Sequence, residues 1–180
     1  MVIDFEDDIL TTNPVPNGSF EDIPSFEDTW YLTNMEPSAP LIQSYSAVTG
    51  QDPQEGLYVM DVEFPNKKLL GYKTSYIDNE FNYTSLFIPN SARLLFDIRL
   101  SGDITDKDYY KLKVTIWNQG SIKGEWTTNL KDLKGSISDQ WSAREIPTTL
   151  NINGQFLLRI TFEKTTDKNE DIKGHIYFDN

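Results

Sequence analysis

The chain has 180 residues, of which 24% are charged and 13% aromatic, a composition typical of one globular domain with a sizeable core. Its formal net charge is −12 and it has no cluster of lysine and arginine, which argues against a nucleic-acid partner and an anionic membrane surface. Because cysteine is absent, disulfides, zinc–thiolate sites and thiol nucleophiles are excluded. No stretch approaches the roughly 18 apolar residues of a membrane span, so no membrane insertion is expected.

The first half of the chain is predicted to consist of turns and short strands. Residues 1–13 are expected to form a linker or an extra edge strand, and 14–180 a single β-sandwich binding domain. The boundary follows from the turn cluster at 13–18, where two prolines and an Asn-Gly pair favour tight turns. Weak alternating patterns predict strands at about 29–33, 41–48, 56–64, 67–76 and 81–88.

Three later segments alternate clearly between apolar and polar residues, namely 92–100, 110–117 and 155–164. Further strands are predicted at 122–128, 140–146 and 173–179, and no helix is expected. This spacing of short strands predicts an all-β fold with two antiparallel sheets. The alternating segments should supply one contiguous core, formed by Leu94, Phe96, Ile98, Leu112, Val114, Ile116, Phe156, Leu158, Ile160 and Phe162.

Catalytic chemistry finds little support in the sequence. The single histidine, His175, lies in the last predicted strand, and no Gly-x-Ser-x-Gly nucleophile turn accompanies it. Paired carboxylates of the kind used in glycoside hydrolysis are available, but no spacing distinguishes one pair from the others. The chain is therefore not expected to be an enzyme.

The polar faces of the alternating strands carry a candidate binding site. Trp117 falls on the polar face of its strand, where an indole is unusual unless it contacts a ligand. Sugar rings stack on aromatic faces and their hydroxyls bond planar polar groups, so this pattern favours a glycan. The polar residues predicted to join Trp117, on strands expected in the same sheet, are Arg93, Asp97, Arg99 and Arg159.

Two terminal motifs resemble those of a known family. They are Asn17-Gly18-Ser19-Phe20-Glu21 and the closing strand that ends Phe178-Asp179-Asn180. Together they resemble the galactose-binding-like jelly-roll carbohydrate-binding modules of families 4, 9 and 22, which are attached to xylanases and cellulases. The resemblance implies a jelly roll in which Trp30 packs or binds ligand.

The resemblance also implies a structural calcium ion. Glu21 and Asp179 would share it with oxygens of the Asn17–Ser19 turn, and a backbone carbonyl at 54–56 would add a ligand. Calcium prefers such mixtures of carboxylates and turn carbonyls.

The combined prediction is a non-catalytic carbohydrate-binding module of an extracellular or cell-surface protein. Its partner would be a poly- or oligosaccharide, and both chain ends are compatible with a module of a larger chain. A structural or adhesive accessory domain of a surface or phage-tail protein, without a sugar ligand, remains the alternative. A glycoside-active enzyme is the third hypothesis.

Overall fold

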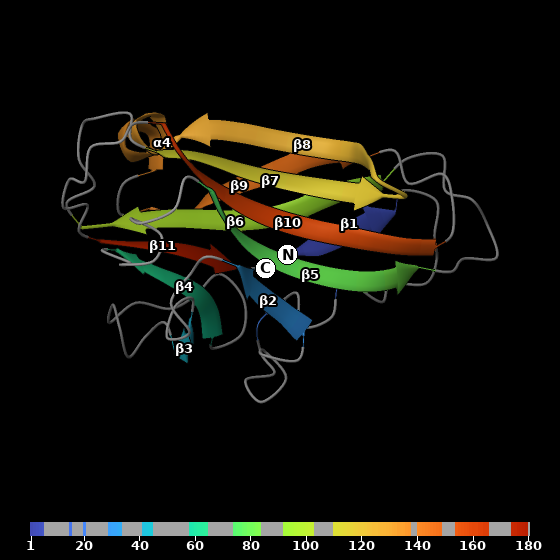
Figure 1. The fold of residues 1–180 in the computed structure, drawn as a ribbon. Coiled ribbons are helices and arrows are strands. Elements are labelled where there is room, and N and C mark those ends of the chain that lie inside the picture. The colour runs from blue at the N-terminus through green and yellow to red at the C-terminus, as the bar shows by residue number, and fades with distance from the viewer. Residues whose placement is uncertain are drawn as a thin grey trace.

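A computed structural model describes residues 1–5, 15, 20, 29–33, 41–44, 58–64, 74–83, 92–102, 110–137, 140–148, 154–165 and 174–179. Over these residues the chain forms strands and one short helix (Figure 1). In chain order they are β1 (Val2–Phe5), β2 (Trp30–Thr33), β3 (Leu41–Ser44), β4 (Tyr58–Phe64), β5 (Thr74–Tyr83), β6 (Ala92–Ser101), β7 (Tyr110–Asn118), β8 (Ser121–Asn129), α4 (Leu130–Ile137), β9 (Ser142–Thr148), β10 (Gly154–Lys164) and β11 (Gly174–Asp179).

The strands form two antiparallel sheets that face each other, as the sequence predicted. The β10 sheet has the order β2-β5-β10-β7-β8, and it lies in front in Figure 1. The β6 sheet has the order β1-β6-β11-β4-β3, with β9 also paired to β6. β6 pairs with β9 over Ala92–Ile98, and this range overlaps the parts of β6 that pair with β1 and with β11. A residue of β6 that pairs with two strands has one on each side, so β1 and β11 both lie on the side opposite β9. The fold is thus an all-β sandwich.

One hydrophobic core fills the space between the sheets. All ten core residues predicted from the alternating strands belong to it, and each is at most 1% exposed. Phe96 of β6 shows how the two sheets meet, because its ring packs against Trp126 of β8 at 5.5 Å between centroids. The alternation of these strands therefore predicted the inward face correctly.

Two predictions about elements were wrong. The strands predicted at 67–76 and 81–88 are not separate at 77–80, because 74–83 form a single strand, β5. The prediction left the polar run Asp78-Asn79-Glu80 between two strands, but Asp78 bonds to Arg159 and Glu80 to Gln155 on the neighbouring β10. Cross-strand partners thus stabilise a segment whose own propensity favours a turn.

The helix α4 was not predicted. Asn129 precedes it, and its side-chain amide donates to the Asp132 carboxylate at 3.2 Å, which ties the end of β8 to the first turn of the helix. Leu130 and Leu133, one turn apart, are both buried. An eight-residue helix is too short to show a helical period in sequence, which explains the miss. No helix of the described part of the chain has the length and apolar character needed to cross a bilayer.

Candidate functional site

The outward face of the β10 sheet brings polar and aromatic residues into one row across four strands. The strand register places Tyr31 of β2 opposite Asp78 of β5, Asp78 opposite Arg159 of β10, and Arg159 opposite Thr115 of β7. Trp117 follows Thr115 by two residues and therefore projects from the same face. These five residues form the outer row.

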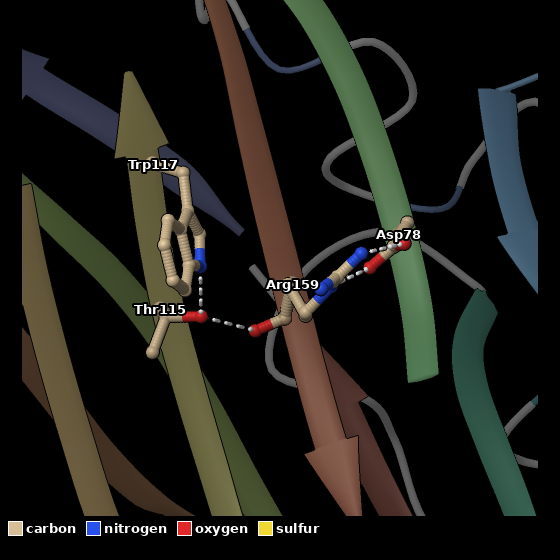
Figure 2. A network of polar contacts seen from close by, with 4 residues as sticks. All are labelled: Asp78, Thr115, Trp117 and Arg159. Atoms are coloured by element: carbon tan, nitrogen blue, oxygen red, sulfur yellow. Dashed lines mark hydrogen bonds and ion pairs between the residues drawn. The ribbon is translucent and has the colours of Figure 1, made fainter. Parts of the chain in front are cut away.

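Trp117 is held in a defined orientation (Figure 2). Its indole Nε1 donates to Thr115 Oγ1 at 2.9 Å, and the Thr115 hydroxyl in turn donates to the carbonyl oxygen of Arg159 at 3.4 Å. Trp117 keeps the regular pairing of β7 with β10, opposite Leu157, because the extra residue where β7 and β8 shift register, Lys123, lies on β8. The indole is partly buried, so it is fixed by its neighbours yet remains accessible.

Arg159 and Asp78 form the polar centre of the row. Arg159 Nε and Nη2 donate to the two carboxylate oxygens of Asp78, each at 2.7 Å, in a bidentate pair. The guanidinium also stacks over the ring of Tyr76, with its carbon 4.4 Å from the ring centroid. The hydrogen bond to Asp78 is the main cause that raises the pKa of Arg159, and it holds the guanidinium in place.

A pocket opens at one side of this row. Its volume is about 520 Å³, within the range of small-ligand sites. Gln155 Nε2 donates to Glu80 Oε2 at 3.1 Å along its edge. The turn after Trp117 closes one end, with positive φ at both Gln119 (49°) and Gly120 (75°), the geometry of a tight two-residue hairpin. Its lining residues are Glu80, Trp117, Asn118, Gln119, Gly120, Gln155, Phe156, Leu157 and Arg159.

The structure brings together only two of the predicted ligand-binding residues, Trp117 and Arg159. Arg93, Asp97 and Arg99 lie on β6, which belongs to the other sheet, so the prediction that they share a sheet with Trp117 was wrong. Their side chains alternate with the inward Leu94, Phe96 and Ile98, and they therefore project from the opposite side of the sandwich. Alternation identifies the outward face of a strand, but it does not tell which sheet the strand joins.

The predicted polar contacts on β6 have other environments. Arg93 Nη1 lies 3.6 Å from Glu145 Oε1 of β9. Arg99 is only 6% exposed. Burial raises the pKa of Asp97.

The remaining tryptophans differ from Trp117. Trp30 is 2% exposed and packs on Phe20 with 5.6 Å between ring centroids, so it is a core residue and not a ligand contact. Trp126 packs on the inner side against Phe96, and Trp141 packs against Val59 and Tyr177 outside the main core. Trp117 is the tryptophan on the outer row.

His175 lies on the β6 sheet, far in the fold from the outer row. Its Nδ1 is 2.9 and 3.1 Å from the two oxygens of Asp61, and its ring stacks parallel to that of Tyr177. The hydrogen bond to Asp61, a carboxylate that is 1% exposed, raises the pKa of His175. His175 is thus a strand residue whose ring is hydrogen-bonded to a buried carboxylate.

The predicted calcium ligands fall mostly outside the described residues. Asn17, Ser19 and Glu21 are among those, as is the carbonyl at 54–56, whereas Asp179 is described and fully buried on β11. Within the described ranges, no group of three or more histidine, aspartate or glutamate side chains is positioned to hold a metal ion. The calcium site therefore stays a prediction.

Several outer-row residues escaped sequence reasoning, namely Tyr31, Asp78 and Thr115, together with Glu80 and Gln155 at the pocket. A signal was present for β10, because the prediction already placed Arg159 on its polar face. The residues of β5 were missed because the prediction left 77–80 outside any strand.

Comparison with known proteins identifies the fold. No family model matches the chain, and no curated protein sequence does. Among solved structures, it is similar to one described as the structural basis for the promiscuous specificity of carbohydrate-binding modules from the β-sandwich superfamily. That match has 11% identity and a TM-score of 0.51, and it covers 86% of this chain and 58% of the other.

A second similar structure is described as a family 28 carbohydrate-binding module specific for non-crystalline cellulose. It is 15% identical over 86% of this chain and 88% of that chain, with a TM-score of 0.43. The first match shows that the chain has a β-sandwich fold like that of a carbohydrate-binding-module structure.

Proposed function

We propose that this chain is a non-catalytic carbohydrate-binding module that holds an uncharged poly- or oligosaccharide against the outward face of the β10 sheet. The observation that supports this most directly is the pocket beside Trp117, whose indole is fixed by Thr115 and flanked by Arg159. An immobilised aromatic face next to planar hydrogen-bonding groups fits a sugar ring, which is apolar on its face and polar at its rim.

The charges on this face favour an uncharged ligand. Arg159 is neutralised by Asp78, and Lys113 by Glu163 at 2.9 Å. The pocket also includes Glu80, and the chain as a whole has a net charge of −12, so a uronate or sulfated glycan would meet repulsion. The hydroxyl groups of a neutral sugar, in contrast, can form hydrogen bonds with these ion-paired side chains, and no net charge has to be removed from water.

The proposal extends to the setting of the module. We place it outside the cell or at the cell surface as part of a larger chain, with a structural calcium ion involving Asp179 and Glu21. The competing function, an accessory domain without a sugar ligand, would be favoured by an extended apolar surface lacking a cleft. The pocket at Trp117 supports the first proposal over the second.

Affinity electrophoresis and calorimetry against soluble neutral and acidic polysaccharides test this function. We expect binding to a neutral member, and a loss of about tenfold or more for Trp117→Ala, because the stacking surface is removed. Absence of binding across the panel, or unchanged binding by Trp117→Ala, would favour the accessory domain.

A matched pair of arginine variants adds a control for position. Arg159 pairs with Asp78 and Arg93 with Glu145; their side chains are 29% and 35% exposed, but they lie on opposite sheets. Arg159→Met should weaken binding, whereas Arg93→Met should leave it unchanged. Weakened binding in Arg93→Met but not in Arg159→Met would indicate that the site lies on the β6 sheet. Melting curves of both variants check that folding is retained.

A further inference from the structure

A second aromatic ring stands at the far end of the outer row. Tyr31 is 53% exposed, and among the described residues it is one of two large hydrophobic side chains that are exposed. It lies on β2, an edge strand of the β10 sheet, directly opposite Asp78. Opposed residues in an antiparallel pair project from the same face, so Tyr31 shares its face with Arg159 and Trp117.

The two rings are separated by a width that a short oligosaccharide can cover. From β7 to β2 there are three strand steps, which at a spacing of about 4.8 Å amount to roughly 14 Å across the sheet. The indole of Trp117 leans back toward Thr115, so both rings belong to the same row. A single sugar unit cannot touch both.

The residues between the rings are polar and ordered. Arg159 directs Nε and Nη2 to Asp78, so among the described residues its third nitrogen, Nη1, has no acceptor and can donate to a ligand hydroxyl. The sequence of groups along the row is therefore aromatic, polar and aromatic, running across the strands.

We infer that Tyr31 is a second stacking site, and that the natural ligand is an extended glycan chain lying across the strands from Trp117 over the Arg159–Asp78 pair to Tyr31. This inference rests on the proposed function and deepens it, since it sets the direction and minimum length of the ligand. The opposite direction is the alternative, because Ile122 of β8 pairs with Trp117 and is 46% exposed.

The test is calorimetric titration with gluco-, xylo- and manno-oligosaccharides, from disaccharide to hexasaccharide. For the series that wild type binds, affinity should rise with length until the chain reaches Tyr31. Tyr31→Ala should remove this rise, weakening long ligands by roughly two- to tenfold, the loss expected for one aromatic contact, while short ligands keep their affinity. Tyr31→Phe should behave as wild type, because stacking does not need the hydroxyl.

Ile122→Ala is the matched control at the other exposed apolar position. It should leave the length dependence intact. If Ile122→Ala flattens it and Tyr31→Ala does not, the ligand runs the other way and the inference is wrong. If Trp117→Ala abolishes binding but Tyr31→Ala matches wild type at every length, only the second site fails. If wild type binds no oligosaccharide of any series, the proposed function fails and the inference fails with it.

Discussion

Replacing Gly124 with alanine should destabilise the sandwich where β8 approaches β9. An added Cβ would lie 2.5 Å from Thr148 Cγ2 and 3.0 Å from the carbonyl oxygen of Pro147, whereas carbon atoms normally pack at about 3.5–4.0 Å. The Thr148 side chain is buried and β-branched, so it has few rotamers with which to avoid the contact. Because the contact is so short, overpacking should cost about 2–3 kcal/mol, and loss of a strand glycine returns about 0.5–1 kcal/mol, which leaves a net loss of about 1–2.5 kcal/mol.

Thermal unfolding followed by circular dichroism measures this effect. For a domain of this size the loss corresponds to a fall in Tm of about 2–10 °C. Thr148→Ser removes the opposing methyl group and keeps the hydroxyl, so Gly124→Ala should cost less stability in the Thr148→Ser background than in wild type. A double-mutant cycle measures this difference. A Gly124→Ala protein that melts at or above the wild-type temperature would refute the close approach of the two sheets at this edge.

Three further predictions concern the core, the histidine and the metal. Phe96→Ala should lower the free energy of unfolding by about 3–5 kcal/mol in urea titrations, because it opens a cavity beneath Trp126 and Phe178; a loss below about 1 kcal/mol would contradict this packing. The hydrogen bond to Asp61 raises the pKa of His175 above its ordinary 6.5, so the native state holds this proton more tightly than the unfolded chain. The stability that this pair contributes is therefore complete below the ordinary pKa and is lost as pH rises through the raised native-state pKa. The Tm measured across this pH window should fall less in His175→Gln than in wild type. Equal falls would contradict the His175–Asp61 hydrogen bond as the cause. Saturating calcium should raise Tm in wild type and not in Asp179→Asn, since an ion bound only to the native state stabilises it, and a Tm unaffected by either calcium or a chelator would count against the ion.

Much of the fold could be predicted because its central strands are buried on one face. The alternation in β6, β7 and β10 is clear, apart from Leu95 and Leu157 at outward positions, so period-two patterning identified the inward residues of both sheets. β5 was misjudged because Asp78 and Glu80 are stabilised by partners on β10, far away in sequence. α4 was missed because two buried leucines one turn apart are too few to reveal a helical period.

The candidate site could be predicted only in part, since it depends on which strands become neighbours. Trp117 and Arg159 were identified as outward residues, and the structure places them on one face. Arg93, Asp97 and Arg99 have the same alternating pattern, yet β6 joins the opposite sheet. Tyr31 gave no sequence signal, because its significance depends on its register with Asp78.

Mapping amide chemical shifts by nuclear magnetic resonance during titration with the neutral polysaccharide panel tests the central claim most directly. We predict shifts confined to β2, β5, β7 and β10, with the largest near Trp117, and an altered Trp117 indole signal. The amides around Arg93 and Arg99 on the opposite sheet should not move. Shifts centred on the β6 sheet, or none with any polysaccharide, would contradict the claim that the outward face of the β10 sheet binds glycans.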